Sequence, residues 1–259
     1  CALPILRLRA PLQSGDTKRT PLAISLVIDR SGSMGGSKSA EAKRCALDLL
    51  ARLDDEDKVS LVVYDTTIDV LLETMPVRLA RTLMPMRLLD VDARGGTALH
   101  AGWLKGAETL APTAGNGMMS RVILLSDGQA NHGIVSTQEI CDQVRELASA
   151  GVTTSTVGIG VDFNEELMTA IANAGQGNSW YGERVEDLAE SFDAEMGFLA
   201  SLAFQDVRVK LETPLLPRMG QIKVRNDYLQ NSKGQYCLPS IAAGSEVRSE
   251  EHTSELQSH

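Results

Sequence analysis

Short, continuous apolar runs constrain the fold of this chain more than any other feature of its sequence. Leu22–Ile28, Val59–Tyr64 and Arg121–Ser126 each hold a strand-length stretch with few polar residues. This pattern is typical of a strand whose sheet is covered on both faces, as parallel sheets are. Helical patterns separate the runs. The middle of the chain therefore predicts an α/β fold, with a doubly wound, mostly parallel sheet flanked by helices.

The same alternation extends from about residue 21 to residue 200. The spacing of apolar residues predicts helices, and the short apolar runs between them predict further strands. The predicted helices are 37–53, 78–89, 98–110, 137–148, 164–173 and 185–198, and the further strands are 68–72, 153–159 and 179–181.

The flanks of the chain have a different pattern. Polar and apolar residues alternate at Leu6–Ala10, Phe204–Leu211 and Gln221–Val224, and Pro214, Pro217 and Gly234 interrupt the region beyond Leu202. Such alternation predicts antiparallel strands without helices. We therefore expect a partial antiparallel β domain that is split in sequence, with the α/β domain inserted between its two parts.

These patterns give four expected regions. Residues 1–20 hold the first strands of the split β domain, 21–200 form the α/β domain, and 201–247 form a truncated second part of the β domain. Residues 248–259 resemble the translation of a sequencing-library adapter, so they are excluded from the fold prediction. Because the first residue is Cys1 and not Met, the chain resembles a fragment of a longer protein.

Composition excludes several classes of protein. The net charge is −9 and no element concentrates Lys and Arg, which argues against nucleic-acid binding. No apolar stretch is long enough to cross a bilayer. The four cysteines form no C-x-x-C pair, so a structural zinc site is not expected, and Cys45 and Cys141 fit buried helix positions. The compartment stays open, with cytoplasmic, periplasmic and cell-surface locations all compatible with the sequence.

Oxygen-bearing side chains gather in three loops that a parallel sheet would bring to one edge. Asp29, Ser31 and Ser33 follow the first buried run, Thr97 ends the segment Gly-Gly-Thr, and Asp127 follows the third run. Ligands of α/β sheets bind at the carboxyl ends of the strands. Carboxylate and hydroxyl oxygens suit small, hard cations such as Mg²⁺. The sequence therefore predicts a cation site made of these five residues.

The combination of Asp-x-Ser-x-Ser with a distant Thr and a distant Asp resembles the von Willebrand factor A domain and its metal-ion-dependent adhesion site. The resemblance covers about residues 22–200, and the segments Gly95–His100 and Leu125–Asn131 are similar to its bacterial branch. It implies that the Ser and Thr hydroxyls contact the metal, that the aspartates often act through water, and that one coordination position stays open for a partner's Asp or Glu.

The resemblance implies a non-enzymatic, cation-dependent protein-binding module. Its cofactor is expected to be Mg²⁺, with Mn²⁺ or Ca²⁺ also compatible, and no catalytic residue is assigned. Two other functions stay open, namely a metal-dependent phosphohydrolase and an accessory subunit of an AAA-type ATPase or chelatase. A phosphohydrolase of this kind requires a second Asp at the position of Ser31. A phosphate-binding P-loop requires Gly directly before the Lys, and this chain has Ser37 before Lys38.

Each motif also has a purely structural interpretation. Asp29, Ser31 and Thr97 could cap the helices that follow them, and Asp127 could belong to an ordinary turn. His132 could contact a ligand or be an exposed loop residue, whereas His100 is expected to pack or hydrogen-bond internally. The acidic run at 54–57 predicts a solvated turn and does not match a calcium-binding loop.

Overall fold

The computed structural model describes residues 7–11, 19–127, 130–160, 163–182, 187–204, 207–210, 230, 233–238 and 241–248. The chain forms two compact units. One comprises Lys18–Ala200, and the other combines Cys1–Thr17 with Ser201–His259.

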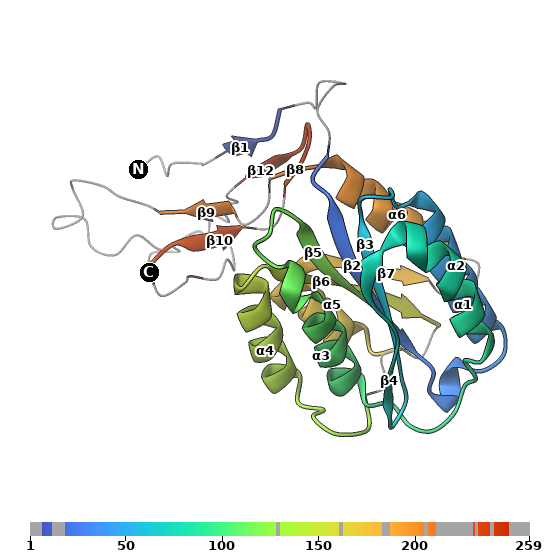
Figure 1. Cartoon of the computed structure of the whole chain (residues 1–259). Helices are drawn as coiled ribbons and strands as arrows, with labels where there is room; N and C mark the ends of the chain where they lie inside the picture. The colour runs from blue at the N-terminus through green and yellow to red at the C-terminus, as the bar shows by residue number, and fades with distance from the viewer. Residues whose placement is uncertain are drawn as a thin grey trace, which may run out of the picture. The chain divides into compact units, whose positions relative to one another are not determined.

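The larger unit is built on a six-stranded sheet with the strand order β4-β3-β2-β5-β6-β7 (Figure 1). Every neighbouring pair is parallel except β3 and β4, which are antiparallel. The sequence prediction of an α/β fold with a mostly parallel sheet is therefore confirmed. The strands are β2 (Leu22–Asp29), β3 (Lys58–Tyr64), β4 (Ile68–Pro76), β5 (Met119–Ser126), β6 (Val152–Ile159) and β7 (Gln176–Gly182).

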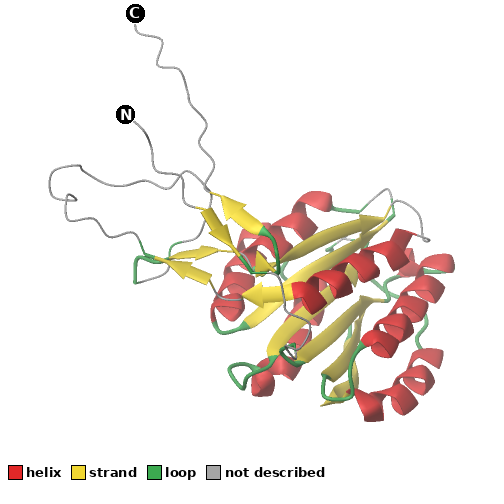
Figure 2. Ribbon diagram, turned by 90° about the horizontal axis from the view of Figure 1, so that it is seen from above, coloured by secondary structure: helices red, strands yellow, loops and turns green. Residues whose placement is uncertain are grey.

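Helices cover both faces of this sheet (Figures 1 and 2). One face packs against α3, α4 and α5, and the other lies beneath α1, α2 and α6. The apolar runs are explained by this double cover, because every residue of β2 and of β5 is buried. The helices are α1 (Ser37–Arg52), α2 (Val77–Leu89), α3 (Leu99–Leu110), α4 (Thr137–Ser149), α5 (Glu165–Ala174) and α6 (Asp187–Ser201).

Strand β4 is longer than the sequence predicted and forms an edge of the sheet. The prediction ended at Leu72, whereas the strand continues to Pro76 through residues that are mostly half-buried. The extra length comes from pairing with β3, since Lys58 lies opposite Pro76. Apolar periodicity is weak in a half-covered edge strand, so the sequence marked only its more apolar first half.

The smaller unit contains short antiparallel pairs, in agreement with the alternation in the flanks. β1 (Arg7–Arg9) pairs with β12 (Glu246–Arg248), so the two flanks of the chain meet in one ladder. The strand predicted at 221–224 and residues 249–259 of the adapter-like tail lie outside the described residues. The remaining pairs are β8 (Leu202–Phe204) with β11 (Ile241–Ala242) and β9 (Val207–Val209) with β10 (Tyr236–Leu238).

The acidic turn between α1 and β3 is only partly solvated, so the sequence interpretation was wrong at one position. Asp57 is fully buried, while the three acidic residues before it are exposed. Its carboxylate accepts hydrogen bonds from the Arg19 guanidinium (2.9 Å) and from the backbone N–H of Leu22 (2.8 Å). A buried charge is tolerated when it is paired and hydrogen-bonded in this way. Asp57 thus fixes the start of β2.

Two expectations from composition agree with the structure. Cys45 and Cys141 are free thiols, and both are buried in helices. Across the described residues, no helix combines the length and apolar character that a membrane span requires.

Candidate metal centre

The predicted ligand residues lie at the edge of the sheet where β2 and β5 end. The two strands are neighbours in parallel register, so Asp29 at the end of β2 lies close to Ser126 at the end of β5. The Ser126 hydroxyl donates a hydrogen bond of 2.6 Å to the Asp29 carboxylate. Asp127 follows Ser126 directly. The fold therefore brings the first and last of the predicted acidic ligands to one place.

Asp29 is buried with little compensation for its charge. One carboxylate oxygen accepts from the Ser31 backbone N–H (2.7 Å) and the other from the Ser126 hydroxyl, and the residue is 2% exposed. Burial raises the pKa of Asp29 from 3.8 to about 6, the hydrogen bonds oppose this rise, and the Asp127 charge adds to it. Neither of these two hydrogen-bond donors carries a positive charge. The Asp29 carboxylate is therefore buried without a charged hydrogen-bond partner among the described residues.

The two serines lie together beside Asp29. Ser31 is 1% exposed, whereas Ser33 is exposed within the 3₁₀ turn Gly32–Met34 (η1), and their hydroxyl oxygens are 3.1 Å apart. Ser31 is the N-cap residue of η1 but makes no side-chain cap bond there, and neither serine caps α1, whose N-cap is Gly36 without a side-chain cap. The helix-cap interpretation is wrong for Asp29 and Ser31.

Thr97 is held by backbone contacts from the loop after β5. Its N–H donates to the Asn131 side-chain oxygen (2.8 Å), and its carbonyl accepts from the N–H groups of Asn131 and His132 (both 3.2 Å). It does not cap α3, whose N-cap is Ala98 without a side-chain bond. The Thr97 hydroxyl forms no hydrogen bond with any described residue, although the residue is only 1% exposed. That hydroxyl is therefore available to a ligand.

Asp127 carries the feature that points most directly to a cation. The residue is 3% exposed, and its Oδ1 atom is buried with no hydrogen-bond partner in the described part of the chain. Its Oδ2 atom lies 3.5 Å from the Lys38 ammonium, whose side chain is 28% exposed. An unsatisfied buried carboxylate oxygen is costly unless a cation or water binds it. The five predicted residues fit a hard divalent cation by donor chemistry.

Backbone hydrogen bonds join the three loops. Gly32 N–H donates to the Gly95 carbonyl (3.2 Å), which ties the serine loop to the Thr97 loop, and the Asn131 contacts tie the Thr97 loop to the end of β5. Within the described residues, no three His, Cys, Asp or Glu side chains cluster as a metal site would require. The candidate centre differs from such clusters because it combines two carboxylates with three hydroxyls.

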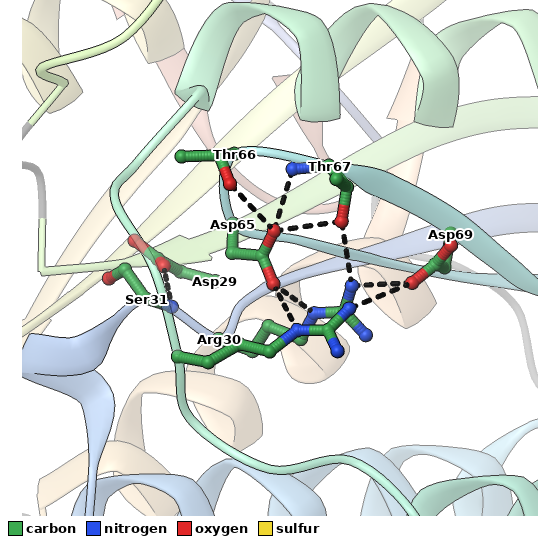
Figure 3. Close-up of polar contacts among 8 residues, drawn as sticks. Asp29, Arg30, Ser31, Asp65, Thr66, Thr67 and Asp69 are labelled. Atoms are coloured by element: carbon green, nitrogen blue, oxygen red, sulfur yellow. Dashed lines mark hydrogen bonds and ion pairs between the residues drawn. The ribbon is translucent and has the colours of Figure 1, made fainter.

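A partly buried ionic network, which the sequence did not reveal, lies beside this centre (Figure 3). Asp65 directly follows β3, and one of its oxygens accepts from Arg30 Nε (2.9 Å) and Arg94 Nε (2.8 Å). Its other oxygen accepts from the N–H and hydroxyl of Thr67, and Arg30 also pairs with Asp69. Burial would raise the pKa of Asp65, but the bonds from Arg94 and Thr67 and the Arg30 charge outweigh it and hold the pKa well below its usual value.

This network fixes the loop that carries Thr97. Arg94 N–H donates to the Arg30 carbonyl and Ala98 N–H donates to the Asp65 carbonyl, both at 2.8 Å. Arg30 occupies the variable position between Asp29 and Ser31, where the motif gives no information. A signal for Asp65 was present, since it directly follows a buried apolar run as Asp29 does.

The two histidines near the loops differ in exposure. His100 is 6% exposed, with Nε2 3.0 Å from the Gln143 side-chain oxygen and its ring beside Trp103, so the prediction of internal packing is confirmed. His132 is exposed and reaches the centre only through its backbone N–H.

Comparison with known proteins finds relatives with similar sequences. An uncharacterised protein of Synechocystis sp. is 28% identical over 209 residues, which are 80% of this chain and 49% of that protein. Inter-alpha-trypsin inhibitor heavy chain H3 of Rattus norvegicus is 24% identical over 88% of this chain and 25% of its own length. This chain therefore spans half or less of these two relatives.

Solved structures show the same fold. A von Willebrand factor type A protein from Catenulispora acidiphila matches with a TM-score of 0.75 at 19% identity, over 94% of this chain and 58% of that one. Proximal thread matrix protein 1 from the mussel byssus, solved with a zinc-occupied MIDAS motif, matches with a TM-score of 0.58 at 17% identity, over 70% and 48%.

The family model for the von Willebrand factor type A domain matches residues 23–194, which is more than half of the 259 residues and contains the candidate metal centre. The match covers nearly all of the described α/β unit, including the candidate ligand residues Asp29 and Asp127 at the ends of β2 and β5. The chain belongs to the von Willebrand factor A domain family.

Proposed function

We propose that this chain is a protein-binding module that depends on a divalent cation. Asp29, Ser31, Ser33, Thr97 and Asp127 would hold Mg²⁺, with Mn²⁺ or Ca²⁺ also accepted, and the cation would bridge to an Asp or Glu carboxylate of a partner protein. The observation that carries this proposal is the buried Asp127 Oδ1 atom, which has no hydrogen-bond partner among the described residues.

The electrostatics of the centre support a cation. Asp29 and Asp127 are both nearly inaccessible, and the charge of Asp127 adds to the burial that raises the pKa of Asp29. A bound divalent ion would supply positive charge that stabilises both carboxylates and attracts an anionic oxygen. The family suggests the same ligand type, because the mussel byssus protein of this fold has a zinc-occupied MIDAS motif.

Binding fits these residues better than catalysis does. A phosphohydrolase would use a second acidic group near Asp29, but the residue two positions on is Ser31, whose hydroxyl contacts Ser33. The nearby acid, Asp65, is already engaged by Arg30 and Arg94 and is poorly suited to proton transfer. We therefore propose no catalytic residue. An accessory role beside an ATPase would be one use of the same binding centre.

Calorimetric titration of Mg²⁺ tests the metal centre. We expect saturable binding to the EDTA-treated and dialysed chain, no binding to Asp127→Ala, and at least about tenfold weaker binding to Thr97→Ala. Thr82→Ala removes an exposed hydroxyl on α2 and serves as the matched control, with unchanged affinity. A folded parent chain that binds no Mg²⁺, or an Asp127→Ala variant that binds like the parent, would overturn the proposal.

The carboxylate bridge needs a separate probe. With Mn²⁺ in the centre, water-proton relaxation reports the water molecules on the ion. Sodium acetate should lower the relaxation enhancement by displacing water, whereas acetamide, which has a similar shape but no charge, should not. Equal effects of the two compounds would contradict a preference for a carboxylate.

A further inference from the structure

Helix α2 carries apolar side chains on both of its faces. Its inner face consists of Val77, Ala80, Met84 and Leu88, all of which are buried. A surface helix normally presents a polar face to solvent, and a helix that is apolar all round is normally covered on both sides. The outer face of α2 does not follow the pattern of a surface helix.

The outer face is apolar and exposed. Leu79 is 52%, Leu83 38%, Met86 62% and Leu89 78% exposed. These four are the majority of the seven large exposed hydrophobic residues in the described part of the chain, and the other three lie on separate segments. Single exposed apolar residues need no explanation, but a concentration on one helix is typical of an interaction site.

Helical spacing places three of these side chains in a row. Leu79, Leu83 and Met86 are at positions i, i+4 and i+7, so they form one stripe along the helix, which we call the outer stripe. This is the arrangement by which one helix packs against another. Leu89 extends the apolar surface at the end of the helix.

Positive charge borders the outer stripe. By helical spacing Arg78 and Arg87 lie on opposite sides of the stripe, both are exposed, and neither forms an ion pair with another described residue. Arg81 is already engaged by Asp55 and the Leu53 carbonyl. The helix contains no acidic residue, although the chain as a whole has a net charge of −9. The outer face of α2 is thus a basic, apolar surface on an acidic protein.

We propose that the outer stripe binds an acidic amphipathic helix of a partner protein. The apolar face of that helix would cover the outer stripe, and its Glu or Asp side chains would pair with Arg78 and Arg87. Charge complementarity selects this occupant, because a partner with basic flanks would meet two unpaired arginines. The stripe contributes no residue to the metal centre, so this contact is independent of the proposed cation-dependent function.

Two model peptides test the proposal. Both are 18-residue helices with the same leucine stripe, and one has Glu and the other Lys beside that stripe. Binding of each fluorescently labelled peptide to the chain is followed by anisotropy in EDTA. The chelator removes any contribution of a metal-bound carboxylate, so this result and the Mg²⁺ titration can fail separately.

Variants then locate the contact. The triple variant Leu79→Gln, Leu83→Gln and Met86→Gln changes only exposed side chains. We expect its affinity for the Glu peptide to be at least about tenfold lower than that of the parent. The double variant Arg78→Glu and Arg87→Glu should bind the Glu peptide more weakly and the Lys peptide more tightly than the parent does. Val135→Gln, which is 51% exposed on another segment, is the matched control and should bind like the parent.

Four results would overturn the proposal. They are equal affinity of the parent for both peptides, undiminished binding by the triple variant, self-association of the parent that the triple variant abolishes in sedimentation equilibrium, and co-sedimentation of the parent but not the triple variant with phosphatidylserine vesicles. The third would assign the outer stripe to a second copy of the chain, and the fourth to a lipid surface.

Discussion

Asp29 and Asp65 occupy equivalent places in the fold but lie in opposite electrostatic environments. Asp29 is the last residue of β2 and Asp65 directly follows β3, and they are 2% and 1% exposed. Burial raises the pKa of Asp29 to about 6, whereas the pKa of Asp65 is held well below its usual value despite its burial. The difference lies in the partners, because Asp65 contacts two arginines and Asp29 contacts a backbone N–H and a hydroxyl.

This difference separates a structural acid from one suited to binding a cation. The arginines neutralise Asp65 and bind the loop of Thr97 through the same contacts. Asp29 and Asp127 have no comparable neutralisation, since the Lys38 ammonium is 3.5 Å from one Asp127 oxygen and the other oxygen has no partner in the described structure. At this edge of the sheet, the paired Asp65 holds the loops in place, whereas Asp29 and Asp127 carry negative charge that a bound cation would neutralise.

The largest expected effect is on stability and comes from Asp65, the acid that is paired with two arginines. Asp65→Ala leaves the buried Arg30 without its buried charge partner, and breaking a buried pair costs about 3–5 kcal/mol. Urea unfolding in EDTA measures this loss. Asp55→Ala removes an exposed partner of Arg81 and should change the free energy of unfolding by less than about 0.5 kcal/mol. A loss below about 1 kcal/mol for Asp65→Ala would show that the network is not structural.

The next effect concerns pH and belongs to Asp29. Its folded pKa of about 6 exceeds the ordinary 3.8, so in metal-free protein its contribution to stability is fully present below about pH 4 and is lost as pH rises through 6. The full difference is roughly 3 kcal/mol.

Asp29→Asn removes this titration and is the comparison that isolates it. Urea unfolding in EDTA from pH 4 to pH 7 should show the parent losing stability relative to the variant. Saturating Mg²⁺ should restore the parent above pH 6 and leave the variant unchanged. If the free energy of unfolding of parent and variant changed in parallel with pH, the raised pKa of Asp29 would be contradicted.

A smaller effect, on Mg²⁺ affinity, is expected from Arg94, which joins Asp65 to the loop that carries Thr97. Arg94→Gln removes one of the two arginines on Asp65 while Arg30 stays in place, so the fold should survive with the Thr97 loop less firmly held. We expect Mg²⁺ affinity to fall several-fold, with only a small loss of stability because the Arg94 side chain is 62% exposed. Calorimetric titration measures the affinity. Arg44→Gln removes an exposed helix ion pair and is the control, and an equal loss of affinity in both variants would contradict a positioning role.

The sequence predicted the sheet edge well because the relevant signals are local. A buried parallel strand is a continuous apolar run, and its last residue marks the edge, so the positions of Asp29 and Asp127 followed from β2 and β5. The Asp-x-Ser-x-Ser spacing likewise lies within one loop. Whether these residues bind a cation stays a prediction.

The parts that the sequence did not reveal depend on contacts between distant segments. Arg30 and Asp65 are 35 residues apart, and only the folded loops show that Arg94 joins them. The burial of Asp57 depends in the same way on Arg19, 38 residues earlier. Helical periodicity predicted α2, but it could not show that Leu79 and Met86 face solvent, because both faces of that helix are apolar.

The smallest expected effect tests whether Lys38 partly fills the electrostatic role of a metal. Its ammonium lies 3.5 Å from Asp127 Oδ2, so it stabilises that carboxylate but opposes a second cation beside it. Lys38→Gln should therefore tighten Mg²⁺ binding several-fold, by about 1 kcal/mol or less, because the lysine is partly exposed and its charge is screened. Calorimetric titration at low and high salt measures the gain, which should shrink with salt. Lys105→Gln, which removes an exposed lysine paired with Glu108, should leave affinity unchanged. If Lys38→Gln weakened Mg²⁺ binding instead, the lysine would be supporting the centre, and partial neutralisation of Asp127 by Lys38 would not oppose metal binding as we expect.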